Sequence, residues 1–270
     1  APASVHAAVD GCEAVVHLAG AVKALRDRDL FQANGEGTRY VVAACAAARP
    51  PPRLVYVSSL AAAGPSPGGR ARTEEDPPAP VSRYGESKLA GERAVRLAAG
   101  AVPATIVRPP IVYGPGDQEL VPQLARMARL GLVVRAGLLD KRFSVIHVED
   151  LCRGLLAALD RGRRVGTAGG EGVYFFEDGA DRSWDEIALA ACAALGRPAR
   201  VLALPEAVGA VAAAASSALA ALTRRPRILS LDKLREMREP AWTCSAARAR
   251  AELGWAPRLP LPEGMADALA

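Results

Sequence analysis

A tyrosine and a lysine four residues apart, Tyr84 and Lys88, have a spacing that suggests chemistry. On a helix such residues lie on one face, with about 5–6 Å between their Cβ atoms. The lysine ammonium can then lower the pKa of the phenol, so that the tyrosine acts as an acid or base nearer neutral pH. The same lysine can also hydrogen-bond ribose hydroxyls. Taken alone, the spacing also fits an ordinary surface pair.

Two further segments could complete a site for proton transfer. Ser59 follows the apolar run Leu54–Ser58, where a hydroxyl could hydrogen-bond the substrate oxygen that exchanges a proton with Tyr84. The run Ala104–Arg108 leads into a proline-rich turn that could form a wall for a flat ring. No metal site is expected, because neither the three histidines nor the five cysteines have a metal-ligand spacing.

These residues need strands and helices to position them, and the first half of the chain predicts both. Ala14–Leu18, Leu54–Ser58 and Ala104–Arg108 are short, apolar and bounded by Gly or Pro, as buried strands are. Helical stretches, Gly37–Ala48 and Ser82–Ala99, lie between them. The alternation predicts an α/β fold, a Rossmann-like parallel sheet covered on both faces.

The second half of the chain predicts a smaller C-terminal substrate lobe. The expected elements are helices over 120–130, 148–159, 183–195 and 246–253 and a strand over 143–148. The helix over 183–195 begins with the spacing of a capping box, Ser183 and Glu186. We therefore expect a partial dinucleotide-binding domain over 1–116. The range 117–270 is expected to be mainly substrate-binding, with some segments returning to the sheet.

The range 201–222 is almost wholly apolar and rich in alanine. It is long enough to be considered as a membrane span, but alanine is a poor membrane residue and a strong helix former. We expect a helix that packs in the smaller lobe or makes peripheral contact with a membrane surface.

Composition and charge favour a globular protein of the cytoplasm. The 34 basic and 29 acidic residues leave a net charge of +5, and hydrophobic residues make up 50% of the chain. The one tight basic run, over 224–227, contains a proline and no aromatic residue, so no nucleic-acid partner is expected. The five scattered cysteines suggest no disulfide framework, and the first twenty residues have no secretory pattern.

In combination, the motifs resemble the extended short-chain dehydrogenases/reductases of the NAD-dependent epimerase/dehydratase superfamily. The resemblance covers essentially the whole chain and is greatest to the 3β-hydroxysteroid dehydrogenase-like and dihydroflavonol reductase-like branch. The motifs follow the family's order: His17–Gly20 (HLAG), Asn34–Thr38 (NGEGT), Val57–Ser59 (VSS), Tyr84–Lys88 (YGESK), Arg108–Gly114 (RPPIVYG), Val148–Asp150 (VED) and Ala247–Trp255 (ARARAELGW).

This resemblance implies roles for individual residues. Tyr84 would be the catalytic acid/base, Lys88 would bind the nicotinamide ribose, and Ser59 would orient the substrate. Asn34 would be the family's structural or proton-relay asparagine. The cofactor, NAD or NADP, would also contact Leu18, Ala19 and Gly20 on its adenosine side, Pro109, Pro110 and Ile111 at the nicotinamide, and Val57 and Ser58. A homodimer formed through the helix that carries Tyr84 is also implied.

The sequence departs from the family at its start. The family begins with a strand and a glycine-rich loop that binds the pyrophosphate, and the 270 residues contain no such loop. The run Ala14–Leu18 corresponds to the family's fourth strand, which would leave it as an exposed apolar edge. We therefore expect a fragment that begins at Ala1 and binds a dinucleotide weakly. The residue that separates NAD from NADP is also missing.

The segment after Ser59 bears on the reaction. Related enzymes that eliminate water carry acidic residues there, whereas this chain has Leu60–Ala63. With the apolar range 201–222, this suggests hydride transfer between NAD(P) and a secondary alcohol or ketone of a hydrophobic, sterol-like or polycyclic small molecule.

Two alternatives stay open. One is a nucleotide-sugar epimerase, in which Arg135 or Arg142 would bind the diphosphate. The other is a non-catalytic dinucleotide-binding or truncated relative, against which the retention of both Tyr84 and Lys88 argues. The identity of the substrate and the direction of the reaction also stay open.

Overall fold

The structure, a computed structural model, describes residues 2–205, 207–208, 211, 215–216, 223 and 231–270. Its elements in chain order are α1 (Pro2–Val9), β1 (Ala14–His17), α2 (Asp27–Phe31), η1 (Gln32–Glu36), α3 (Gly37–Ala47), β2 (Arg53–Val57), α4 (Leu60–Ala63), η2 (Pro67–Gly69), α5 (Arg83–Leu97), β3 (Ala104–Arg108), β4 (Ile111–Tyr113), α6 (Leu120–Leu130), β5 (Leu132–Ala136), β6 (Arg142–Phe143), β7 (Val145–His147), α7 (Val148–Arg161), β8 (Val173–Phe175), β9 (Arg182–Ser183), α8 (Trp184–Ala194), β10 (Arg200–Leu204), α10 (Leu231–Arg238), β11 (Ala241–Trp242), α11 (Ala247–Leu253) and α12 (Leu261–Leu269).

A parallel sheet with the strand order β1-β2-β3-β8 forms the centre of the larger part, which confirms the predicted α/β class. In the register of β2 and β3, Leu54 lies opposite Ala104 and Val57 opposite Val107. Strand β1 lies at the edge of this sheet, with Ala14 exposed and Val15 half-buried. The described strands therefore leave an apolar edge at β1, as the sequence predicted.

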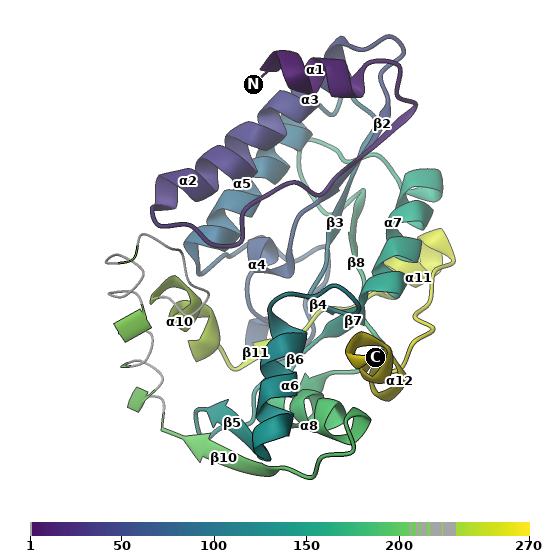
Figure 1. The fold of residues 1–270 in the computed structure, drawn as a ribbon. Coiled ribbons are helices and arrows are strands. Elements are labelled where there is room, and N and C mark those ends of the chain that lie inside the picture. Colours follow the sequence, from purple (N-terminus) through teal and green to yellow (C-terminus); the bar gives the residue numbers. More distant parts are fainter. Residues whose placement is uncertain (1, 206, 209–210, 212–214, 217–222, 224–230) are drawn as a thin grey trace.

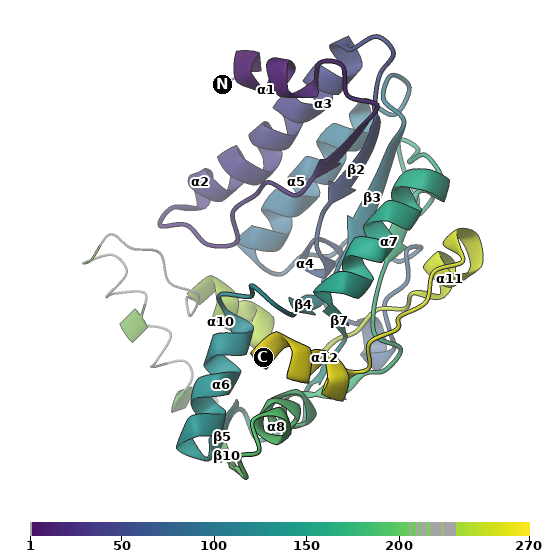
Figure 2. The same ribbon diagram turned by 45° about the vertical axis from the view of Figure 1, so that its right-hand side comes forward.

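Successive side chains of β2 point alternately to two different layers of helices. Leu54 and Tyr56 pack in a core with residues of α1, α3 and α5, whereas Val55 and Val57 pack with residues of α7 and α11. This is the period of two that a strand buried on both faces requires. Figure 2 shows α3 and α5 on one side of the sheet and α7 and α11 on the other.

The chain returns to this sheet after leaving it. Strand β8 pairs with β3, and helices α7 and α11 cover one face, although all three come from the second half of the sequence. Trp255, which follows α11, packs its ring edge-on against Phe176, with centroids 4.8 Å apart. Ring edges and faces attract in this arrangement, which fixes the closing segment on the core.

The smaller lobe contains the parallel pair β5 and β10 and the helices α6, α8 and α12. Its core joins Leu124, Ile187 and Met265, one residue from each helix. The capping box predicted at the start of α8 is present, since Ser183 Oγ accepts from Glu186 N at 3.0 Å and Glu186 accepts from Ser183 N at 2.6 Å. Figure 1 shows this lobe below the sheet, with α4 between them.

Two predicted elements differ from the structure. The helix expected over 201–222 is wrong at its start, because residues 200–204 form β10, paired in parallel with β5. Much of the rest of that range lies outside the described residues. The strand expected over 143–148 is divided at Ser144, whose hydroxyl and amide bond to the backbone of Cys244 and Trp242. Within the described residues, no helix has the length and apolar character that a membrane span needs.

Candidate active site

Tyr84 and Lys88 lie on α5, whose start is fixed by Ser82. The Ser82 hydroxyl caps the helix by accepting from Gly85 N at 3.0 Å. A Cβ at position 85 would lie 2.3 Å from the carbonyl oxygen of Ala61, so only glycine permits this approach. The first turn of α5 therefore packs directly on α4, the short helix that follows Ser59.

This packing joins the predicted serine and tyrosine. Ser59 is the N-cap of α4, with its hydroxyl accepting from Ala61 N at 3.1 Å, and it lies close enough to Tyr84 to lower the pKa of that phenol. Burial raises the pKa of Tyr84 to about 12, against the smaller lowering effect of Ser59. The net shift of the Tyr84 pKa is therefore upward, opposite to the lowering expected from Lys88.

Lys88 is buried at the end of β2, with 4% of its surface exposed. Its ammonium donates to the carbonyl oxygen of Val57 at 2.7 Å and lies 4.8 Å from the centre of the Tyr56 ring. Burial lowers the pKa of Lys88 to about 8, and the negative charge of Glu92 opposes this. The lysine therefore titrates close to neutral pH.

Asn34 lies in η1, a π-helical segment of the kind often found at functional sites. Its side chain is fully buried and makes three hydrogen bonds of 2.8 Å. Its amide oxygen accepts from Ala21 N, and its amide nitrogen donates to Ala21 O and to the hydroxyl of Ser87. Of the two roles implied by the resemblance, these bonds favour the structural one, because they use the side chain to hold the loop after β1.

The other predicted cofactor contacts surround these residues. Leu18, Ala19 and Gly20 are exposed at the end of β1, and a Cβ at position 20 would lie 3.7 Å from the Lys88 ammonium. The carbonyl of Pro109 accepts from Leu60 N at 2.8 Å, beside Ser59. Of the other residues predicted to contact the cofactor, Pro110 and Ile111 are half-buried and Ser58 is buried.

Some residues beside the site were missed by the sequence reasoning. Ser58 Oγ donates at 2.6 Å to the buried carboxylate of Glu92, which also binds Arg108 through two hydrogen bonds of 2.7 and 2.8 Å. Two features of the sequence could have pointed to this pair. One is a glutamate one helical turn after Lys88, and the other is an arginine at the end of a buried strand. An arginine at such a position needs a partner.

A second group that was missed comes from α10. Asp232 accepts from the backbone N–H groups of Arg83 at 2.8 Å and Tyr84 at 3.3 Å, and Ser82 donates to Glu236 at 2.6 Å. These two carboxylates lie at the positive end of the α5 dipole, where negative charge is favourable. The sequence signal was too short to recognise, because α10 has only eight residues.

The two arginines considered for diphosphate binding already have partners. Arg135 lies 2.7 Å from Asp185, and Arg142 lies 3.4 Å from Glu186 and 3.6 Å from Asp140. A diphosphate would have to displace these carboxylates.

The residues fit the nicotinamide ribose half of a dinucleotide. A lysine ammonium has three donors, and the bond to Val57 uses one of them. A Cβ at position 20 would lie 2.6 Å from the Asn34 amide oxygen and 3.7 Å from the Lys88 ammonium, so only glycine lets the loop after β1 lie this close to both. The chain thus has residues to hold ribose hydroxyls beside Tyr84.

Comparison with known proteins agrees with this geometry. The model of the NAD dependent epimerase/dehydratase family matches residues 1–169. The chain is 35% identical over 237 residues to a ceramide reductase of Caulobacter vibrioides, covering 88% of this chain and 67% of that protein. It is 32% identical to the 4-hydroxy-2-methyl-3-oxo-4-farnesyl-3,4-dihydroquinoline-1-oxide ketoreductase of Stigmatella aurantiaca, covering 96% of this chain and 77% of that protein.

A solved structure supports the fold in the same way. The dTDP-glucose 4,6-dehydratase of Streptomyces venezuelae, determined with NAD bound, superposes with a TM-score of 0.76 at 20% identity. The match covers 100% of this chain and 76% of that one.

Proposed function

Because this chain belongs to the NAD-dependent epimerase/dehydratase family, the extended short-chain dehydrogenases/reductases, we propose that it is a reductase that interconverts a ketone and a secondary alcohol on a hydrophobic substrate. Its cofactor is NAD or NADP. The observation that carries the proposal is the placement of Ser59 beside the phenol of Tyr84, with Lys88 one helical turn away.

Each of these side chains has a role in reduction. When bound, the nicotinamide supplies the hydride that reaches the carbonyl carbon. Tyr84 gives its phenolic proton to the carbonyl oxygen, so that hydride and proton together convert the ketone to an alcohol. Ser59 orients that oxygen, and the charge of Lys88 offsets the negative charge left on the phenol.

The segment after Ser59 supports a reductase over a dehydratase. Leu60–Ala63 form α4, and none of these side chains can donate or accept a proton. Elimination of water needs such a group beside the substrate, in addition to Tyr84.

The sequence suggested a hydrophobic substrate because of Leu60–Ala63 and the range 201–222. In the structure, the support for such a substrate comes from other observations. The side chain of Leu60 packs on Phe175 and Cys244 in the protein's own core, so α4 is not itself a substrate wall. Support comes instead from the two relatives, whose names specify a ceramide and a farnesylated quinoline. In the smaller lobe, Leu138 and Leu139 expose 69% and 73% of their surfaces beside the end of β5.

A panel of substrates tests the proposal. The full-length gene product would be incubated with NADH or NADPH and with a long-chain β-keto amide, a steroid ketone or UDP-glucose. Oxidation of the reduced cofactor with one of the two ketones, followed by isolation of the alcohol, supports the proposal. Conversion of UDP-glucose without added cofactor would instead favour the epimerase, against which the ion pairs of Arg135 and Arg142 argue. Turnover of none of them would favour a non-catalytic relative.

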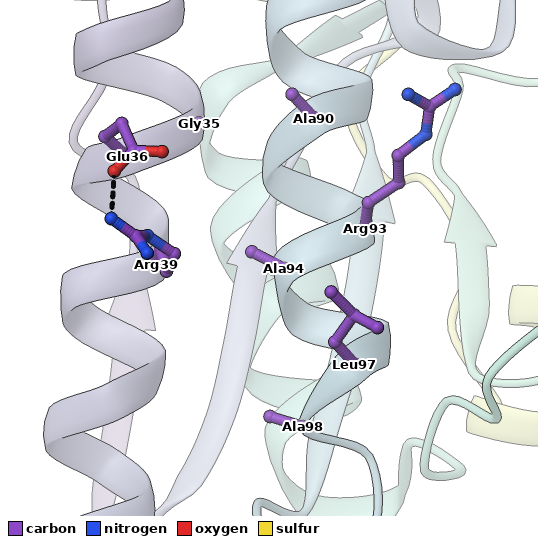
Figure 3. A pocket seen from close by; sticks show the side chains of 8 residues that line it. All are labelled: Gly35, Glu36, Arg39, Ala90, Arg93, Ala94, Leu97 and Ala98. Carbon is purple, nitrogen blue, oxygen red and sulfur yellow. Dashed lines mark hydrogen bonds and ion pairs between the residues drawn. The ribbon is translucent and has the colours of Figure 1, made fainter.

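We also propose a homodimer formed through the outer face of α5. Figure 3 shows a shallow groove between this face and the neighbouring helix, and the residues that line it are Gly35, Glu36, Arg39, Ala90, Arg93, Ala94, Leu97 and Ala98. Leu97 is 88% exposed, and the groove carries charges of both signs. A twofold axis could pair those charges between two copies of the chain.

A further inference from the structure

Glu92 is a fully buried carboxylate that the proposed reaction does not use. It lies two turns after Tyr84 and one turn after Lys88, so the three residues share one face of α5. Its partners come from two strands of the sheet: the hydroxyl of Ser58 after β2 and the guanidinium of Arg108 at the end of β3. One carboxylate therefore ties the Tyr84 helix to two adjacent strand ends.

Those two strand ends lead into the candidate active site. Ser58 precedes Ser59, which lies beside Tyr84, and Arg108 precedes Pro109, whose carbonyl accepts from Leu60 N. The exposed fraction of Arg108 is only 2%. A buried ion pair of this kind often adds little to stability compared with apolar residues of similar size, because both charges lose their hydration. The position of the pair therefore calls for a role beyond stability.

The charge of Glu92 also acts on Lys88. The titratable groups that face the lysine ammonium are Glu92 and Tyr84 on α5, Tyr56 on β2 and His17 on β1. Burial raises the pKa of both phenols, and it lowers the pKa of His17 to about 4. At neutral pH these three groups are uncharged. Among the described residues facing Lys88, the negative charge therefore comes from Glu92.

We propose that Glu92 is a positioning residue of the active site: it anchors the segments that begin at Ser58 and Arg108 against α5, and its charge keeps Lys88 an ammonium. This inference rests on the proposed function for the use of that ammonium. The placement of the charge is tested separately, without cofactor or substrate.

The test measures the protonation of Lys88 by NMR of the lysine side chains. The chain has four lysines, and the Lys88 signal is assigned by its loss in Lys88→Arg. Glu92→Gln alone leaves Arg108 buried without its partner and can unfold the chain. The double variant Glu92→Gln with Arg108→Met removes both charges and is therefore the main test. Glu86→Gln, an exposed charge on the same helix, is the control.

We expect the pKa of Lys88 to fall by about one unit in the double variant, because Glu92, one turn from Lys88 on α5, acts on the lysine more strongly than Arg108 on β3 does, and to stay unchanged in Glu86→Gln. A folded double variant in which Lys88 titrates as in the parent would overturn the proposal. The pH profile of kcat/KM in the full-length gene product then tests the use of the ammonium. If the NMR titration shifts and the profile does not, Glu92 acts on Lys88 as proposed, whereas the catalytic role given to Lys88 fails.

Discussion

The side-chain amide of Asn34 donates a 2.8 Å hydrogen bond to the hydroxyl of Ser87, one residue before Lys88. The Ser87 hydroxyl in turn donates to the carbonyl of Tyr84 at 2.7 Å. Through its two bonds to Ala21, Asn34 also holds the loop after β1. One side chain thus sets the distance between the loop expected to bind the cofactor and the helix that carries the catalytic tyrosine.

Replacing Asn34 by Ala should loosen both sides of this connection. The three hydrogen bonds of this buried side chain disappear and leave the Ala21 backbone without these partners, which should lower the free energy of unfolding by about 2–3 kcal/mol. The affinity for NAD(P)H should fall as well, because the loop at Gly20 is no longer held. Urea denaturation and a fluorescence titration of the full-length gene product measure the two effects. Gln32→Ala, an exposed change in the same η1 segment, should alter neither, and equal losses in both variants would refute the role given to Asn34.

The buried ammonium of Lys88 should lower the free energy of unfolding at neutral pH. Its pKa is lowered from 10.5 to about 8 in the folded chain, so the unfolded chain binds that proton more tightly. The penalty is complete below pH 8 and disappears as the pH rises from 8 towards 10.5. Lys88→Met should therefore stabilise the chain at pH 7 by about 1–2 kcal/mol, after allowing for the lost bond to Val57.

The measurement is the unfolding free energy without cofactor at pH 7 and pH 10, for the parent and for Lys88→Met. The advantage of the variant should shrink at the higher pH, while its affinity for NAD(P)H is lost. Lys23→Met, which removes an exposed lysine paired with Glu119, serves as the control. A variant that is less stable than the parent at pH 7 would contradict the burial argument.

Much of the fold could be predicted from local patterns. The parallel strands are apolar runs with clear ends, and α6 spans the predicted residues, Leu120–Leu130. Strand β10 could not be predicted in the same way, because its pairing with β5 is a tertiary contact that overrides the helical preference of an alanine-rich range.

Some features of the candidate site could likewise be predicted from the sequence, whereas others depend on tertiary packing. The spacing of Tyr84 and Lys88 is visible in the sequence, and the structure places Ser59 beside Tyr84. The elevated pKa of Tyr84 was missed because burial depends on packing between α4 and α5. Arg108 and Glu92 are sixteen residues apart on different elements, so nothing local connects them.

Leu97→Glu should separate the proposed dimer. The substitution places a charge among the residues that line the groove, where an interface between two copies would bury it without a partner. Light scattering coupled to gel filtration should report a dimer for the parent and a monomer for the variant. Leu130→Glu changes another exposed leucine, on α6, and should leave the mass unchanged. A monomeric parent would rule out this interface.

The most direct test of the proposed reductase is Tyr84→Phe in the full-length gene product, assayed with NAD(P)H and the ketone that the parent reduces. The variant keeps the ring and loses the proton that the carbonyl oxygen needs. Turnover should therefore fall by about 10²–10⁴-fold, while the dissociation constant of NAD(P)H should change by less than about twofold, since Lys88 still holds the ribose. Tyr40→Phe, on the surface of α3, should behave as the parent. Undiminished turnover in Tyr84→Phe would contradict the assignment of this tyrosine as the proton donor.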